Sequence, residues 1–467
     1  MKHLLILGGG AAGLAAAVTG LEAGARVTVL EKRRYLCGNG RYAEGMFAAG
    51  SRLQRRLNID ARPEELFRRA MEYSHWRADA RLVRSLIDRS GETVDWLMGL
   101  GVPFSRLLHH MPNQTPEVFH MAYPAPTGLR VTSVLEARCR ELGAELLTEA
   151  PARSLLLENG AVAGAAAELR DEKREFRADA VLICTGGFAG NPELMRRMIP
   201  GCDPDAYAHL KGIAMEGDGY RMASSAGADT PRDIAIEGCA PVYFGRGEIT
   251  AMIRRPDALW INALGQRFCD ESICSDFILG QNAVARQPGR MCWALLDAAE
   301  VRRARDGQPG MMAPPEASDN GMGGLYSAIE LGLRKGDILR ADAPEALAQA
   351  AGIDPAVLTE ELDRYNAACS AGHDELFGKD RRSLIPLREP PFYAVRAGMD
   401  IITTHGGIRV DEHMRVLTPD RHPIPGLFSA GIDISGVDSG DYSVALSGHA
   451  FGFAVTGGRR AAEEMLR

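Results

Sequence analysis

The first thirty residues alternate between apolar runs and small residues. Leu4–Leu7 is a short apolar run, Ala11–Val18 consists of small and apolar residues, and Val27–Leu30 is a second apolar run. Short apolar runs bounded by glycine are typical of buried strands, and a longer alanine-rich stretch is typical of a helix. The pattern therefore predicts a strand, a helix and a second strand within residues 3–31.

Farther along the chain, apolar residues recur with helical spacing in several segments. The segments predicted as helices are Glu64–Tyr73, Ala80–Leu100, Arg130–Leu142, Glu216–Gly227 and Ala445–Leu466. Ser154–Leu157 and Ala161–Leu169 are predicted to form a hairpin through the turn Asn159-Gly160. Phe176–Thr185 is predicted as one apolar strand.

The pattern changes near Ile236 and returns near residue 401. Residues 236–400 mix short strands, helices and proline–glycine segments, among them Asp306–Gly324, which is expected to be a loop. We therefore predict an α/β protein whose Rossmann-type domain is discontinuous in sequence, with residues 1–235 as its first part and 401–467 as its second. An α+β domain, residues 236–400, is inserted between them.

Composition excludes several classes of function. The 467 residues are 46% hydrophobic and 25% charged, and the net charge is −7. This balance is ordinary for a globular protein and gives no basic patch for nucleic acid. The sequence has no leader and no long apolar run, so we expect a cytoplasmic protein without membrane insertion. Nine dispersed cysteines lack zinc spacing, so no metal is expected.

The first turn carries the pattern Gly8-x-Gly10-x-x-Gly13. Gly8 permits the tight turn, Gly10 allows the backbone to approach a pyrophosphate, and Gly13 allows the helix to pack close to the sheet. The helix start supplies unpaired N–H groups to the phosphates. Glu31 ends the second strand, 18 positions after Gly13, where a carboxylate accepts hydrogen bonds from ribose hydroxyls. The unit predicts nucleotide binding.

Further motifs follow this unit in a fixed order. They are Gly38-Asn39-Gly40, Cys184–Gly187, Gly217–Gly219, Trp260–Glu271, Thr404–Gly407 and Gly426–Gly431. With this set the whole chain resembles the FAD-dependent fumarate reductase/succinate dehydrogenase flavoprotein superfamily, which includes soluble flavocytochrome c fumarate reductases and 3-ketosteroid Δ1-dehydrogenases. The resemblance implies FAD, a cap over the flavin ring, and hydride exchange between flavin N5 and an activated carbon–carbon bond.

The resemblance also implies which residues contact FAD. The start of the last helix, near Ser447, is expected at the N1 edge of the flavin, where a helix N-terminus stabilises negative charge. Asp433 is expected near the ribityl chain, although relatives place their acid one position earlier. The full set is Gly8, Gly10, Ala11, Ala12, Gly13, Glu31, Lys32, Gly38, Asn39, Gly40, Thr185, Gly186, Gly187, Asp218, Gly431, Asp433, Ala445, Leu446 and Ser447.

The chain departs from the dicarboxylate enzymes of this superfamily at four positions. Where they carry His or Arg to hold carboxylates and deliver a proton, this sequence has Ala240, Ser275, Thr403 and Ala445. A buried carboxylate without its partner costs several kcal/mol. Fumarate and succinate are therefore poor candidate substrates.

Several residues are candidates for the chemistry that remains. Tyr442, in the loop before the last helix, is a candidate proton donor or carbonyl polariser, or else packs on the helix start. Asp441 either tunes that tyrosine or caps the helix. His405 is a candidate for proton transfer or only for backbone contact with flavin, and Arg286 replaces the missing arginine or is a solvated helix end. Thr403, Thr404 and Ser275 are candidate substrate contacts.

These observations predict an FAD-dependent oxidoreductase acting on an enone, an enoate or a cyclic ketone. Direction stays open between reductase and dehydrogenase. No haem or iron–sulfur motif is present, so electrons are exchanged with an external partner. Two alternatives remain, namely a flavin oxidase of the amine or amino-acid type and a non-catalytic flavoprotein with a decayed site.

Overall fold

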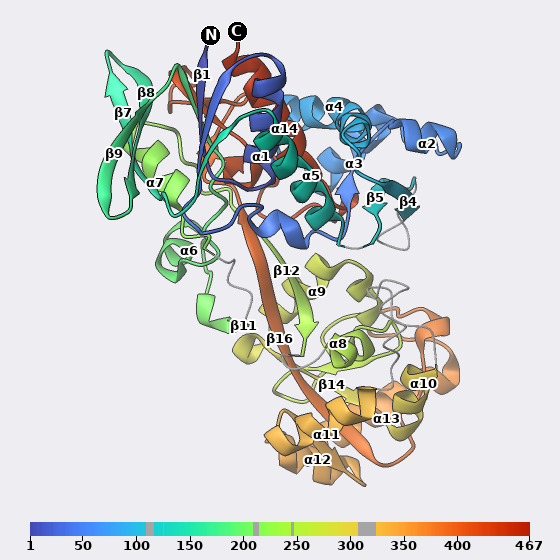
Figure 1. Ribbon diagram of the computed structural model, residues 1–467. Coiled ribbons are helices and arrows are strands. Elements are labelled where there is room, and N and C mark those ends of the chain that lie inside the picture. The colour runs from blue at the N-terminus through green and yellow to red at the C-terminus, as the bar shows by residue number, and fades with distance from the viewer. Residues whose placement is uncertain (109–115, 125, 209–213, 244–246, 307–323) are drawn as a thin grey trace. The chain divides into compact units, whose positions relative to one another are not determined.

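A computed structural model describes residues 1–108, 116–124, 126–208, 214–243, 247–306 and 324–467 (Figure 1). The expected loop at 306–324 lies almost wholly outside the described residues. The chain divides into two compact units. Unit 1 comprises Met1–Cys202, Lys211–Glu237 and Ile402–Arg467, and unit 2 comprises Asp203–Leu210 and Gly238–Ile401. Among the described residues, no helix has both the length and the apolar character needed to cross a bilayer.

A six-stranded sheet forms the centre of unit 1. Its strands follow the order β18 (Arg415–Leu417), β19 (Pro423–Ser429), β10 (Ala180–Ile183), β1 (His3–Leu7), β2 (Arg26–Leu30) and β6 (Glu145–Leu147). The last five are parallel, and β18 is antiparallel to β19. Leu4–Leu7 are fully buried, as expected for a parallel sheet covered on both faces. This topology confirms the predicted Rossmann-type α/β class.

Helices cover this sheet. α1 (Ala11–Glu22) and α14 (His449–Met465) pack against each other, and their backbones approach so closely that a Cβ on Gly458 would lie 2.1 Å from the Ala12 carbonyl oxygen. The other helices of unit 1 are α2 (Arg52–Arg56), α3 (Pro63–Tyr73), α4 (Ala80–Gly99), α5 (Thr127–Glu141), α6 (Pro192–Met198) and α7 (Asp218–Ser225). Residues distant in sequence therefore build one nucleotide-type core.

Short sheets flank this core. The predicted hairpin is confirmed as β7 (Ala152–Glu158) and β8 (Ala161–Leu169), with φ of +50° at Asn159 and +79° at Gly160. The remaining strands of unit 1 are β3 (Met46–Phe47), β4 (Phe104–Leu108), β5 (Phe119–Ala122), β9 (Glu172–Arg177), β17 (Ile408–Arg409) and β20 (Ile434–Ser435).

Three predicted elements were wrong in their bounds by three residues or more, and one of them, the helix expected from Arg130, begins at Thr127. The expected strand 176–185 is split, because β9 pairs with β8 whereas β10 enters the central sheet. Between them, Asp179 accepts a hydrogen bond from the His3 backbone N–H. The last helix begins at His449 rather than at Ala445, because Gly448 adopts φ of +81° and interrupts the helical backbone.

Unit 2 combines a mixed sheet with helices. β16 (Phe392–His405) pairs with β11 (Tyr207–Ala208), β12 (Ala235–Val242), β14 (Cys292–Leu296) and β15 (Ile338–Ala341), and β14 pairs with β13 (Leu259–Ile261). The first three residues of β12 and the last four of β16 belong to unit 1. The helices are α8 (Gly247–Ile253), α9 (Phe277–Ala285), α10 (Ala298–Asp306), α11 (Leu325–Lys335), α12 (Pro344–Ala351) and α13 (Pro355–Ala371).

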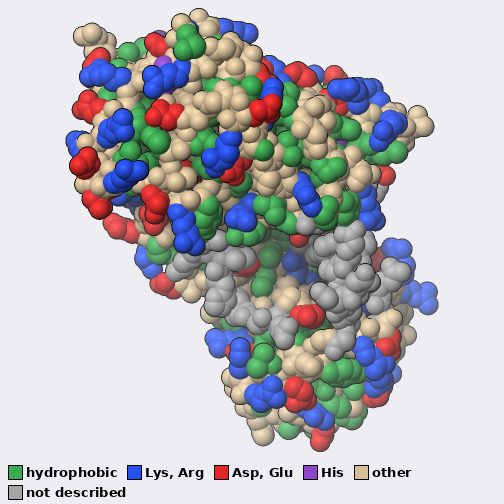
Figure 2. Space-filling model, in the orientation of Figure 1, with side chains coloured by type: hydrophobic (Ala, Val, Ile, Leu, Met, Phe, Trp, Pro, Cys, Tyr) green, Lys and Arg blue, Asp and Glu red, His purple; other side chains and the backbone are tan. Residues whose placement is uncertain are grey.

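A buried ion network stabilises unit 2. Glu271 contacts Arg267 and Lys379, each at 3.0 Å, and Asp374 contacts Arg267 at 3.1 Å. These side chains are at most 2% exposed, so each charge depends on its partners. The motif ending in Glu271 therefore holds the inserted unit together. On the face shown in Figure 2, basic and acidic side chains are interspersed, in keeping with the sequence.

Candidate functional site

The glycine turn after β1 has the geometry of a phosphate cradle. Gly8 has φ of +115°, and its N–H donates to the Leu30 carbonyl at 2.8 Å. A Cβ on Gly13 would lie 2.0 Å from the Gly8 oxygen, so only glycine allows α1 to pack there. A Cβ on Gly10 would meet no atom within 4 Å. The first N–H groups of α1, at Ala11, Ala12 and Gly13, have no acceptor within the helix and suit a pyrophosphate.

Glu31 is held beside this turn. The residue is 7% exposed, and its carboxylate accepts hydrogen bonds from the Gly9 N–H at 2.9 Å and from the Arg33 N–H at 2.8 Å. Each oxygen keeps a second lone pair for a ribose hydroxyl. Lys32 instead pairs with Asp218 at 2.7 Å, so these two candidates neutralise each other.

The loop after β2 fits the same ligand. A Cβ on Gly38 would lie 3.2 Å from Gly10 Cα, and Gly38 has φ of +50°. A Cβ on Gly40 would lie 3.1 Å from the Ala11 Cβ. The Asn39 Oδ1 atom is buried without a hydrogen-bond partner. A buried orphan acceptor is costly unless a ligand donates to it. These residues therefore fit FAD, whose pyrophosphate and ring they would contact.

Thr185, Gly186 and Asp433 are linked at the carboxyl end of the sheet. The Gly186 N–H donates to Asp433 at 2.8 Å, and the Thr185 hydroxyl lies 3.4 Å from the same carboxyl group. Burial raises the pKa of Asp433 to about 7, although these hydrogen bonds lower it. Gly431, two residues earlier, has φ of +81°. Ribityl contact by Asp433 stays a prediction.

Thr404 packs against the segment that follows Thr185 and Gly186. Its hydroxyl accepts from the Phe188 N–H at 2.8 Å, and a Cβ on Gly187 would lie 2.4 Å from the Thr404 oxygen. The Thr403 hydroxyl lies 3.4 Å from the Met215 sulfur. Both threonines are buried and contact the protein itself, which argues for positioning the loop rather than holding a substrate.

Five side chains, four of them buried and one partly exposed, form a cluster near the start of α14. His405 Nδ1 lies 3.1 Å from Asp438, and His405 Nε2 lies 3.0 Å from Glu237. His449 Nε2 lies 3.0 Å from the same Asp438 oxygen. The Tyr442 ring stacks on His449 at a centroid distance of 4.5 Å. We call Glu237, His405, Asp438, Tyr442 and His449 the histidine cluster.

The charges of the histidine cluster follow from these contacts. Burial lowers the pKa of His405, but hydrogen bonds with Asp438 and Glu237 outweigh it and raise the pKa to about 9. Burial alone would raise the pKa of Asp438, but the two histidines hold it well below its usual range. Burial, together with the charges of Glu237 and Asp438, raises the pKa of the Tyr442 phenol well above its ordinary value. The site therefore holds a protonated phenol at neutral pH.

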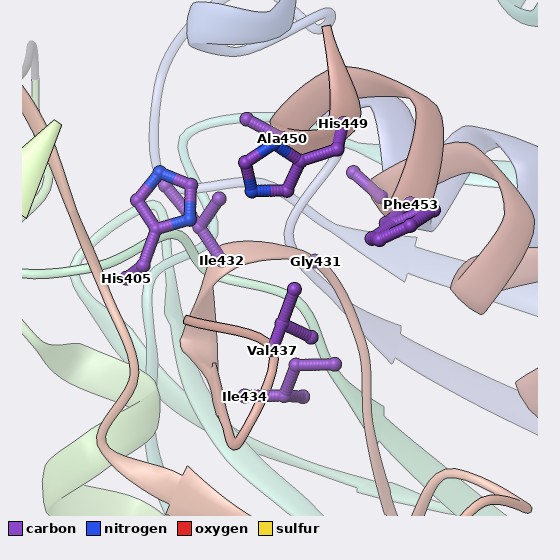
Figure 3. Close-up of a pocket in the computed structure, with 9 residues that line it drawn as sticks. His405, Gly431, Ile432, Ile434, Val437, His449, Ala450 and Phe453 are labelled. Carbon is purple, nitrogen blue, oxygen red and sulfur yellow. The ribbon is translucent and has the colours of Figure 1, made fainter. Parts of the chain in front are cut away.

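A small pocket adjoins the histidine cluster (Figure 3). The two imidazole rings, from β16 and from the first turn of α14, lie on its upper side in this view. Its apolar walls include Ile432, Val437 and Phe453. The Ala450 N–H, in the first turn of α14, hydrogen-bonds to the Tyr442 oxygen. The phenol therefore lies beside a wall of the pocket. Ala445, Leu446 and Ser447 occupy the turn before α14.

A metal ion would compete with existing contacts in this cluster. Ligand atoms of His405, Asp438 and His449 lie within 4.8 Å of one another. Both His405 nitrogens already face carboxylates, and His449 Nδ1 faces the Leu446 carbonyl at 3.1 Å. Shared protons therefore account for this spacing.

The other candidates lie elsewhere. Asp441 is half-exposed and lies 3.7 Å from Arg77. Arg286 is exposed at the end of α9 in unit 2, and Ser275 ends a short 3-10 turn, Glu271–Ser275, of the same unit. Ala240 is fully buried in β12. The acids that act on Tyr442 are Glu237 and Asp438, and neither was a candidate from the sequence.

Comparison with known proteins decides the family. Residues 3–442 match the family described as FAD binding domain. The chain belongs to this family. Among curated proteins it is 30% identical to the vinyl phenol reductase of Lactiplantibacillus plantarum, over 98% of this chain and 94% of that protein. It is 27% identical to a fumarate reductase (cytochrome) of Shewanella frigidimarina, over 99% of this chain and 77% of that protein.

Solved structures agree on the fold. The 3-ketosteroid Δ1-dehydrogenase from Sterolibacterium denitrificans superposes with a TM-score of 0.79 at 20% identity, covering 100% of this chain and 99% of that one. An open flavocytochrome c3 fumarate reductase gives 0.76 at 23% identity, covering 100% and 79%. As a member of the FAD binding domain family, the protein is an FAD-dependent oxidoreductase, and the predicted superfamily and cofactor are confirmed.

Proposed function

We propose that the protein exchanges a hydride with a carbon–carbon double bond that is conjugated to one carbonyl, carboxyl or phenol group. Bound FAD supplies the hydride chemistry at its N5 atom. The observation that carries the proposal is the buried Tyr442 phenol, which is kept protonated beside Glu237 and lies next to the pocket at the start of α14. Such a phenol donates a proton to carbon or polarises a carbonyl.

The residue types of the site support a substrate with little negative charge. Ala240, Thr403 and Ala445 stand where a dicarboxylate enzyme needs cations, and none of them pairs with a carboxylate. The similar vinyl phenol reductase adds a hydroxystyrene to the substrates worth testing. A small-molecule substrate and an external electron partner follow from this chemistry. A cytoplasmic location stays a prediction from the sequence.

The substrate class is tested by anaerobic photoreduction of the flavin, followed by reoxidation with single compounds. The panel is 4-vinylphenol, an enone, a mono-carboxylic enoate and fumarate. We expect reoxidation by at least one of the first three and none by fumarate. Fumarate turnover in the usual enzyme range of about 1–1,000 per second would contradict the proposal. Fast reoxidation by oxygen alone, with stoichiometric peroxide, would favour the oxidase alternative.

The proton donor is tested by two variants. Tyr442→Phe should keep FAD and the fold but slow flavin reoxidation by the active alkene about 100-fold, the usual scale for losing a general acid. Arg286→Ala is the matched comparison, because Arg286 is exposed in unit 2. Single-turnover kinetics separate the two residues. Normal rates in the tyrosine variant, with a collapse in the arginine variant, would move the role to Arg286.

A further inference from the structure

The contacts of the histidine cluster form an unbroken chain. The Tyr442 hydroxyl hydrogen-bonds to Glu237, Glu237 contacts His405 Nε2, and His405 Nδ1 contacts Asp438. Asp438 in turn contacts His449 Nε2. The side chains of His405, Asp438 and His449 are at most 5% exposed, whereas that of Glu237 is 16% exposed. Among these four side chains, Glu237 is therefore the one through which the series of hydrogen bonds reaches solvent.

The hydrogen-bond acceptors around the His405 and His449 rings determine how many protons the two rings carry. Both His405 nitrogens face carboxylates, and the His449 nitrogens face a carboxylate and the Leu446 carbonyl. Carboxylates and carbonyls only accept hydrogen bonds, so each of these four contacts needs its own proton. Two imidazolium rings and two carboxylates satisfy all four contacts and balance in charge. Asp438 also accepts from the Ser443 N–H at 2.9 Å, which favours its ionised form.

This arrangement leaves no N–H of His405 free for a substrate. Both of its nitrogens are engaged at 3.0–3.1 Å. His405 is therefore a positioning and proton-holding residue, and its route outward runs through Glu237 to the Tyr442 hydroxyl.

We propose that Glu237, His405, Asp438 and His449 form a proton relay that reprotonates the Tyr442 oxygen after each turnover. The inference rests on the proposed function. In the reductive direction, the Tyr442 O–H turns about its C–O bond from Glu237 to the substrate, which the fixed ring N–H groups of His405 cannot do. The O–H bond then breaks, and its proton forms a C–H bond on one alkene carbon while the other carbon takes the hydride from reduced flavin. The His405 Nε2 proton then passes to Glu237, and Glu237 returns a proton to the tyrosine oxygen. His405 is left neutral, with its remaining N–H on Asp438, until solvent restores the proton through Glu237.

Glu237→Gln tests the link between His405 and Tyr442. The amide keeps the shape of the side chain but does not carry a proton between these two groups. We expect normal FAD content and photoreduction, a turnover at least tenfold slower with the active alkene, and loss of the pH dependence near 9. Glu172→Gln, an exposed acid on β9, is the control. Turnover within twofold of wild type with an unchanged pH profile would overturn the relay.

Chemical rescue separates a relay from a structural role. Glu237→Ala leaves space beside Tyr442, and added acetate or formate should restore turnover in a concentration-dependent way. A structural defect would not respond to a small acid. Absence of rescue in a variant that binds FAD normally would overturn the relay.

A measurement without substrate keeps the inference distinct from the proposed function. In 15N spectra of histidine-labelled holoenzyme at pH 7, we expect two buried rings protonated at both nitrogens. Asp438→Asn should return at least one of them to a neutral form. Two neutral rings in the wild type would overturn the relay, as would a stoichiometric metal ion that His449→Ala removes. Doubly protonated rings together with no alkene turnover would instead refute the proposed function alone.

Discussion

His405 is a buried cation that depends on two carboxylates. Desolvation alone would favour the neutral ring, but the contacts with Asp438 and Glu237 raise its pKa to about 9. A pKa above the unfolded value of about 6.5 means that the folded state binds the proton more tightly. The stabilisation is therefore complete below about pH 6.5 and is lost as the pH rises through 9.

This linkage predicts that the free energy of unfolding depends on pH and that one substitution weakens the dependence. The free energy of unfolding should fall by roughly 3 kcal/mol at most between pH 6.5 and pH 10 because His405 releases its proton. Urea unfolding at several pH values measures it. His405→Gln should show a smaller fall, since other titrating groups are unchanged. Parallel curves for the two proteins would contradict the assignment of the proton to His405.

Only some residues of the histidine cluster could be predicted from the sequence. His405 was selectable because it precedes the pair Gly406-Gly407, and Tyr442 because it lies in the loop before the last helix. Glu237 lies 168 positions before His405, and no local pattern relates the two. Asp438 and His449 belong to segments already selected, but only the fold shows that one carboxylate bridges two rings.

At the scale of elements, α1 and α14 pack through small residues. A Cβ on Gly458 would lie 2.1 Å from the Ala12 oxygen and 2.8 Å from its carbonyl carbon. Backbone atoms have no rotamer by which to avoid the added carbon. The two helices would have to separate, which would disturb the start of α1 that fits the pyrophosphate.

Gly458→Ala should therefore destabilise unit 1 by at least about 2 kcal/mol and weaken FAD binding. Gly99→Ala is the control, because Gly99 is the last residue of helix α4 and its Cβ would meet no atom within 4 Å. We expect the control to leave stability unchanged or to raise it by up to about 1 kcal/mol. Thermal unfolding with and without added FAD measures both variants. Equal Tm values for the two would refute this account of the interface.

Helices with a strong apolar periodicity were predicted well. Strands whose bounds depend on which sheet they join were predicted less well. Helix α4 could be predicted because its apolar residues have helical spacing and form one buried face. These residues include Leu82, Leu86, Val94 and Leu97. The strand predicted at 176–185 became two strands, because its halves pair with different sheets. Local sequence carries the period of a strand but not the identity of its neighbour.

The ordered motifs along the chain were enough to predict the fold class of the protein. The discontinuous Rossmann-type domain with an inserted unit is confirmed by the sheet order and by the structural neighbours. The cradle residues lie in unit 1, as the glycine pattern requires. Their contacts with FAD remain predictions, because the sequence specifies the backbone path and not the ligand pose.

The holoenzyme should release its flavin intact. Cys37 is the nucleophile next to the Gly38–Gly40 loop, and burial raises the pKa of its thiol to about 11, so it is not a thiolate at neutral pH. We expect a yellow protein with FAD bound non-covalently. Acid precipitation followed by chromatography of the supernatant measures this. FMN in the supernatant, or flavin retained in the pellet, would contradict the prediction.

The division of unit 1 along the chain has a consequence for biosynthesis. β19 and α14 belong to its core, yet residues 402–467 leave the ribosome only after all of unit 2 has been made. Until then the parallel sheet has β10 as an open edge, and the small-residue face of α1 lacks the helix that covers it. The nascent chain therefore carries an unfinished Rossmann-type fold through most of its synthesis, and this fold is complete only after α14 has been translated.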